Sequence, residues 1–95
     1  MTEGDWNKAL RGDPDREVVV KGEVVMARYL VSDAISAYAK ELARKDRKDK
    51  AARLRYIAGR ISQGNVPSKK SLDGAFTDLA VVKKRLVDGK KLQEA

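Results

Sequence analysis

Apolar residues recur at three- and four-residue steps along the first half of the chain, from Val24 to Leu42. This spacing is typical of the buried face of an amphipathic helix. The pair Asp13-Pro14 marks where such a helix begins, because Asp caps free backbone N–H groups and Pro suits the first helical position. We therefore predict a long first helix over residues 14–45.

Residues 17–25 support two interpretations. Their five Val residues flank the pair Lys21-Gly22. Because β-branched residues favour strands and a Gly-containing pair can turn a hairpin, this segment can form two short strands. The alternative is a helix, favoured by the cap before it and by Glu17, which lies four residues before Lys21. We expect the helix, bent at Gly22, and keep the hairpin as the alternative.

The apolar stripe loses its phase after Leu42. Leu54 follows twelve residues later, about 120° out of register on a continuous helix, so we predict a break near residues 45–49. Asp49 then caps a second helix over residues 50–63. The predicted buried face of that helix consists of Leu54, Ile57, Ala58 and Ile61.

Gly64 ends the second helix and opens a connection rich in turn residues. Ser68 or Ser71 caps a third helix over residues 69–88. The predicted buried face of the third helix consists of Leu72, Ala75, Phe76, Leu79, Val82 and Leu86. The pattern predicts a single all-α domain over residues 1–95, a small bundle of three main helices.

The two ends of the chain add little to this bundle. Residues 1–12 form an acidic N-terminal segment, in which Trp6 and Leu10 are four residues apart and so dock a short leading turn on the bundle. Residues 89–95 form a basic tail that we expect to fray.

The 95 residues contain neither His nor Cys. This excludes a thiol nucleophile, an imidazole base, a disulfide and a Cys or His metal site. We therefore expect a protein that is not an enzyme and has no catalytic residues, metal or cofactor. No stretch approaches the ~18 apolar residues of a membrane span, and the N-terminus lacks a signal-peptide pattern, so we expect a cytoplasmic protein with no membrane partner.

Positive charge collects in the second half of the chain. Lys and Arg outnumber Asp and Glu by 21 to 14 overall, and the first 43 residues carry a net −2 whereas the last 52 carry +9. Such asymmetry favours polyanionic partners. The predicted phosphate contacts are Arg44, Lys45, Arg47, Lys48, Lys50, Arg53 and Arg55, followed by Lys69 and Lys70 at a helix start. The resulting hypothesis is a nucleic-acid-binding or regulatory accessory protein that contacts phosphates without sequence specificity.

A solvated basic helix face is the alternative interpretation of the same charges. Asp46 and Asp49 each lie four residues before a Lys or Arg and can form surface ion pairs of about 0.2–0.5 kcal/mol. Tyr56, among the arginines, either stacks on a base or covers the rim of the core.

The segment Val66-Pro67-Ser68-Lys69-Lys70-Ser71-Leu72 locally resembles the start of the second helix in winged-helix regulators of the GntR type. Separately, the short Gly-containing turn between the second and third predicted helices is typical of a helix-turn-helix unit, in which the later helix lies in the major groove. Residues 79–82, Leu-Ala-Val-Val, lack the turn and the polar opening of a recognition helix. We therefore do not assign the chain to that family.

The valines near the start of the first predicted helix suggest a different class of function. They give that helix apolar residues on more than one face, which short partner helices cannot cover. The predicted interface residues are Val18, Val19, Val20, Val24 and Val25. The alternative function is therefore a helical adaptor or inhibitor, of the kind that mobile elements encode. The predicted partners are thus nucleic acid or an acidic protein. We also expect a homodimer formed through the first predicted helix, which would duplicate the basic surface and so suits the nucleic-acid-binding hypothesis.

Overall fold

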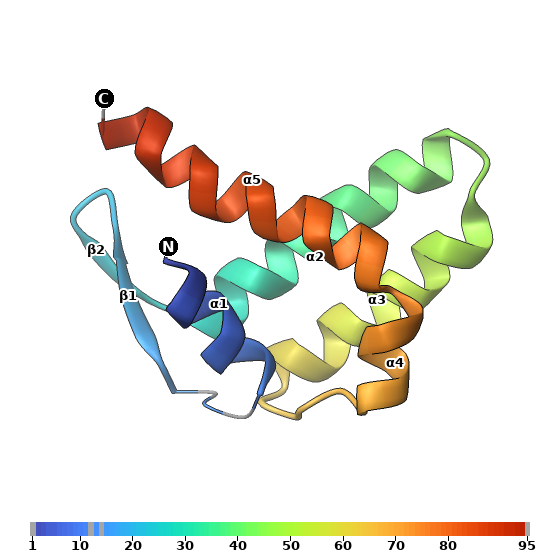
Figure 1. Cartoon of the computed structure of the whole chain (residues 1–95), viewed down its shortest axis with the longest axis horizontal. Coiled ribbons are helices and arrows are strands. Elements are labelled where there is room, and N and C mark those ends of the chain that lie inside the picture. The colour runs from blue at the N-terminus through green and yellow to red at the C-terminus, as the bar shows by residue number, and fades with distance from the viewer. Residues whose placement is uncertain (1, 12, 14, 95) are drawn as a thin grey trace.

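The computed structural model describes the backbone of residues 2–11, 13 and 15–94, and side chains up to residue 87. Over this part of the chain the fold is mostly helical, as the sequence predicts, with one small sheet. In chain order the elements are α1 (Glu3–Leu10), β1 (Glu17–Val20), β2 (Glu23–Met26), α2 (Ala27–Arg44), α3 (Lys48–Ser62), α4 (Lys69–Gly74) and α5 (Phe76–Glu94). Figure 1 shows α5 crossing α2, with the hairpin and the α2–α3 turn at opposite ends of the long axis.

The predicted helix over residues 14–45 is wrong in its first half, where the chain forms the β1–β2 hairpin. Lys21 and Gly22 connect the strands, and both have positive φ angles, 54° and 82°. A two-residue type I′ turn requires this at both central positions. Gly22 is therefore part of a turn and does not bend a helix.

The hairpin forms because its register sorts the valines onto two faces. Val18 pairs with Val25, and Val19 pairs with Val24, in an antiparallel ladder. Val18 is 6% exposed and belongs to the core, whereas Val19 and Val24 are 58% and 63% exposed. A strand segregates alternate residues in this way, while a helix would have spread the same valines around its circumference.

The predicted break near residues 45–49 is confirmed and has a defined geometry. Asp46 has a φ of 62°, and its N–H donates to the carbonyl of Ala43 at 3.2 Å. The next N–H, of Arg47, donates to the carbonyl of Leu42 at 2.9 Å. These two bonds make a Schellman motif, which ends α2 and turns the chain back toward α3.

The start of α3 differs from the prediction in one detail. The helix begins at Lys48, and its N-cap is Arg47, which makes no side-chain capping bond, so the predicted cap Asp49 lies inside the first turn. The end of α3 is as predicted, because Gly64 has a φ of 81° and stops the helix.

The predicted third helix over residues 69–88 is two helices. Ser68 caps α4 as expected, but α4 ends at Gly74, Ala75 is its C-cap, and α5 begins at Phe76. α5 then extends past residue 88 to Glu94, so the segment expected to fray, residues 89–95, is helical up to its last residue, which lies outside the described chain.

The core lies among α2, α3 and α5, with α1 packed onto it. Its largest fully buried side chains are Val31, Ile35, Leu54, Ile57, Ile61 and Val82. The predicted docking of the N-terminal turn is confirmed, since Trp6 is 3% and Leu10 9% exposed. Phe76 was predicted to be buried, and this is wrong, because it is 72% exposed at the start of α5.

Candidate functional site

The turn between α2 and α3 gathers four cationic side chains, Arg44, Lys45, Arg47 and Lys48, all of them exposed. We call this group the cationic corner. It lies at one end of the long axis of the molecule, at the right of Figure 1. The carboxyl end of α2 carries partial negative charge, which stabilises nearby cations. A hydrogen-bonded turn therefore presents a concentration of positive charge to solvent.

The cations of α3 extend the corner in two rows. Residues seven apart lie nearly one above the other on a helix, because seven steps of about 100° come within about 20° of two full turns. Lys48 and Arg55 therefore form a first row, and Arg53 and Arg60 a second row. The two rows project about 140° apart, one on each side of the exposed face of α3.

The strip between the rows carries Ala52, Tyr56 and the carboxylate of Asp49, which all project at angles between those of the two rows. Tyr56 projects about 160° away from Leu54, and the two side chains are 58% and 0% exposed. Ala52 is exposed on the same strip. The Arg60 guanidinium lies 6.0 Å from the centre of the Tyr56 ring, within reach of a cation–π interaction. The one acidic residue of α3, Asp49, is also exposed.

One predicted phosphate contact, Arg53, has a structural role as well. Its Nη1 donates a hydrogen bond to the backbone carbonyl of Gly74 at 2.7 Å. This bond satisfies a carbonyl at the carboxyl end of α4 and ties α4 to α3. A guanidinium has five N–H donors, so Arg53 keeps donors for a further partner.

Three basic residues outside the predicted site are engaged by carboxylates. Three ion pairs are Arg16 with Asp5, Lys83 with Glu3, and Arg85 with Glu41. The hydrogen bond from Arg85 holds the pKa of the Glu41 carboxyl below its ordinary value. By contrast, within the described chain no carboxylate oxygen lies within 4.0 Å of the cationic groups of the predicted site, which are Arg44, Lys45, Arg47, Lys48, Lys50, Arg53, Arg55, Lys69 and Lys70.

The remaining predicted residues lie elsewhere. Lys50 is half-buried in the first turn of α3. Lys69 and Lys70 are exposed on α4, which Figure 1 shows apart from the cationic corner. The structure therefore brings six of the nine predicted cations together along the corner and α3, places Lys50 on a less exposed side of α3, and leaves the two lysines of α4 separate.

The predicted apolar interface is divided by the hairpin. Val18 is buried in the core and unavailable to a partner, which corrects its inclusion. Val20 and Val25 are half-buried, and Val19 and Val24 form the exposed cross-strand pair. The apolar surface offered by this segment is therefore smaller than the sequence suggested.

Sequence reasoning missed two features. The two-row arrangement on α3 could have been found from the seven-residue spacing of its cations. The second feature is a groove of about 600 Å³ lined by residues of α1, α4 and α5. It could not have been found from the sequence, because its lining comes from segments far apart in the chain.

Comparison with known proteins assigns no relatives: no family model, curated protein sequence or solved structure matches the chain.

None of the helices in the described part of the chain has the length and apolarity that crossing a bilayer would demand. The helix that would serve as the recognition helix of a helix-turn-helix unit is divided at Ala75. The functional argument therefore depends on the surfaces of this chain alone.

Proposed function

We propose that the protein is a non-enzymatic nucleic-acid-binding accessory protein that contacts phosphates with the cationic corner and α3. The observation that carries this proposal is the clustering of unpaired cations. No carboxylate oxygen lies within 4.0 Å of the cations of the corner and of α3 in the described chain, and these cations lie on one turn and the helix that follows it. Unneutralised, clustered cations release the counterions of a nucleic acid when they bind it, which supplies the affinity.

The dimensions of α3 suit the major groove of duplex DNA. A helix with its side chains is about 10–12 Å wide, and the major groove is about 12 Å wide. With the exposed face of α3 turned into the groove, the row of Lys48 and Arg55 approaches one phosphate strand, and the row of Arg53 and Arg60 approaches the other. Seven residues rise about 10.5 Å, the axial distance of about three phosphates along one strand.

The strip between the rows explains why this binding is expected to be independent of sequence. Ala52 has no side-chain donor or acceptor for a base edge, and Tyr56 offers one hydroxyl and an aromatic face. Base edges are read by bidentate groups such as Arg, Asn or Gln at the centre of a recognition helix. Asp49, exposed at the amino end of α3, repels phosphate and favours a placement in which the carboxyl half of α3 enters deepest.

The proposal is tested by titrating the protein into a fluorescein-labelled duplex of 20 base pairs at 50 mM salt and following fluorescence anisotropy. The double variant Lys48→Gln/Arg55→Gln removes the first row. We expect its affinity to fall by about tenfold or more, equally for duplexes of different sequence.

The matched control is Lys8→Gln/Lys21→Gln, which removes the same net charge from exposed positions on α1 and the hairpin turn. We expect the control to bind within about threefold of the unaltered protein. Equal losses in both double variants would show that net charge alone drives binding and would refute the α3 surface. If the unaltered protein did not bind the duplex at 50 mM salt, the proposed nucleic-acid-binding function would be refuted.

A second candidate function is self-association through the hairpin. Val19 and Val24 lie opposite each other and are 58% and 63% exposed, and a two-stranded sheet has unpaired edges that can accept another strand. A second copy of the chain would cover these valines symmetrically and place two cationic corners on one assembly. Sedimentation of the unaltered protein and of Val19→Thr/Val24→Thr tests this: a dimer lost in the double variant supports it, and a monomer at all concentrations refutes it.

A further inference from the structure

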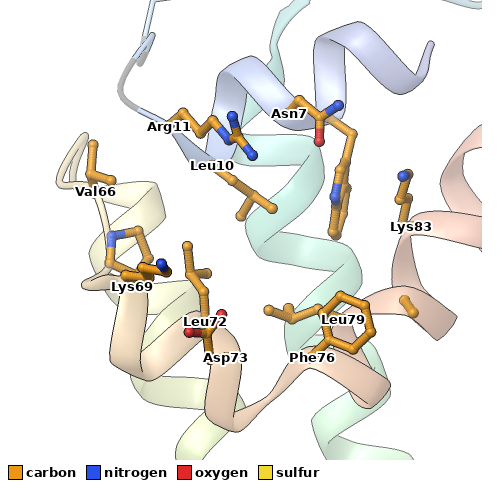
Figure 2. A pocket seen from close by; sticks show the side chains of 13 residues that line it. Asn7, Leu10, Arg11, Val66, Lys69, Leu72, Asp73, Phe76, Leu79 and Lys83 are labelled. Carbon is orange, nitrogen blue, oxygen red and sulfur yellow. The ribbon is translucent and has the colours of Figure 1, made fainter.

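The groove against α1, α4 and α5 combines an apolar floor with a cationic rim. Figure 2 shows Leu10, Leu72 and Leu79 projecting into it from the three helices. Its volume is about 600 Å³, within the range of about 300–1,000 Å³ found for sites of small organic ligands. The apolar lining therefore offers a ligand-sized surface.

Charged groups stand around this floor unevenly. Arg11 and Lys69 line the groove and are exposed, and no carboxylate oxygen lies within 4.0 Å of either in the described chain. Lys83 also lines the groove, but its ammonium is paired with Glu3 at 2.6 Å. The one acidic residue in the lining is Asp73. Cations thus outnumber acids, and the two unpaired ones face the same half of the groove.

The relative positions of these side chains define two ends. Figure 2 shows Arg11 and Lys69 on the side of the groove where Val66 lies, and Phe76 toward the opposite side. Phe76 is 72% exposed, although its ring is among the largest apolar side chains of the fold. An exposed aromatic ring at the edge of an apolar groove is the kind of surface that a ligand covers.

We propose that this groove binds an anionic amphiphile, a molecule with one carboxylate and an apolar acyl chain. Its carboxylate lies between Arg11 and Lys69, and its chain follows Leu10, Leu72 and Leu79 toward Phe76. Carboxylate and guanidinium form a bidentate pair, which orients the head group. The groove volume of about 600 Å³ equals that of about twenty water molecules at about 30 Å³ each. A half-open groove of this volume has room for an acyl chain of about ten carbon atoms.

This site is separate from the phosphate-binding surface proposed above. The groove uses α1, α4 and α5, whereas the proposed nucleic-acid surface uses the α2–α3 turn and α3. Neither proposal therefore depends on the other, and each fails on a different measurement.

The test uses the full chain and decanoate as the probe, with decyltrimethylammonium as the matched cation and decanol as the neutral control. Binding is followed by the fluorescence of Trp6, the one Trp of the chain and part of the groove lining. We expect decanoate to bind at least about tenfold more tightly than either control. We expect Arg11→Gln and Lys69→Gln each to weaken decanoate binding by about threefold to tenfold.

Two further variants separate a charge effect at the groove from a general one. Asp73→Asn removes the acidic residue of the lining, so we expect it to tighten decanoate binding. Lys8→Gln removes an exposed cation of α1 that does not line the groove, so we expect decanoate binding to stay unchanged.

Several outcomes would overturn the proposal. Equal binding of decanoate and decyltrimethylammonium would show a groove without charge selection. Loss of affinity in Lys8→Gln as large as in Lys69→Gln would show that decanoate responds to net charge. Failure of decanoate to bind, together with binding of a synthetic helical peptide of Leu and Glu that is lost in Arg11→Gln, would reassign the groove to a protein partner.

Discussion

Replacement of Asp5 by Ala should destabilise the fold well beyond what an exposed carboxylate would. The Asp5 side chain is 11% exposed, accepts two hydrogen bonds and makes one further ion-pair contact. Its Oδ2 accepts from the backbone N–H of Thr2 at 3.2 Å, its Oδ1 accepts from Nε of Arg16 at 3.0 Å, and Nη2 of Arg16 lies 3.0 Å from the same Oδ1. The first bond completes a capping box at the start of α1. The other two tie α1 to the residue that precedes β1.

The size of the effect follows from these bonds. Losing the capping-box acceptor costs about 1 kcal/mol, and losing a charge-assisted pair costs about 1.5 kcal/mol or more when it is buried. Because the Arg16 side chain is 40% exposed, solvent screening reduces the second contribution to about 1 kcal/mol. We therefore expect Asp5→Ala to lower the free energy of unfolding by about 2 kcal/mol, which lowers Tm by about 8–16 °C for a domain of this size.

Urea unfolding monitored by Trp6 fluorescence measures this loss, since Trp6 lies on α1 and is 3% exposed. The control is Asp33→Ala, which removes an exposed carboxylate from α2 and should change the free energy of unfolding by less than about 0.5 kcal/mol. A loss below about 0.5 kcal/mol in Asp5→Ala would refute the account of how α1 is held.

The pH dependence gives an independent check. Burial raises the pKa of the Asp5 carboxyl, but hydrogen bonds from Thr2 and Arg16 outweigh burial, so the pKa lies below its ordinary value of 3.8. A carboxyl with a lowered pKa in the folded state contributes stability above its unfolded pKa and loses it as the pH falls through the folded value. The difference between the unaltered protein and Asp5→Ala should therefore shrink below about pH 4. A difference that stays constant to pH 2 would contradict the ionised pair.

The other predictions concern the core and the hairpin. Leu54→Ala, at a fully buried position of α3, should lower the free energy of unfolding by about 2–5 kcal/mol in urea titrations, and a loss below about 1 kcal/mol would place Leu54 outside the core. Lys21→Asn should raise the free energy of unfolding by about 0.5 kcal/mol, because Asn tolerates positive φ better than Lys, and a decrease would contradict the type I′ turn. Gly22→Ala should cost about 1 kcal/mol or more in the same assay, since its φ is 82°; an unchanged urea midpoint would show that the turn tolerates a side chain there.

The helical core was predictable because its apolar spacing is regular. The phase shift between Leu42 and Leu54 predicted the break that Asp46 makes with its left-handed backbone. The hairpin was harder to predict than the helices, because its turn has Lys21 at the position where Asn or Asp would have indicated a type I′ turn. The one local contact in favour of a helix, between Glu17 and Lys21, is worth about 0.2–0.5 kcal/mol, less than burying Val18 in the core.

Long-range contacts account for what the sequence could not predict. The predicted third helix divides after Gly74, whose carbonyl is bound by Arg53 from another helix, and no local pattern reports such a bond. The groove is assembled from α1, α4 and α5 in the same way. The cationic corner was predictable as a cluster, but its lack of carboxylate partners in the described chain depends on where Asp46 and Asp49 project.

The salt dependence of duplex binding tests the central claim most directly. The four cations in the two rows of α3 contribute about −3.6 to the slope of log affinity against log salt concentration, and phosphate contacts made by the rest of the cationic corner make the slope steeper. Removing the first row with Lys48→Gln/Arg55→Gln should make the slope less steep by about 1.8. Equal slopes for the two proteins would contradict the claim that α3 and its cations meet the phosphate backbone.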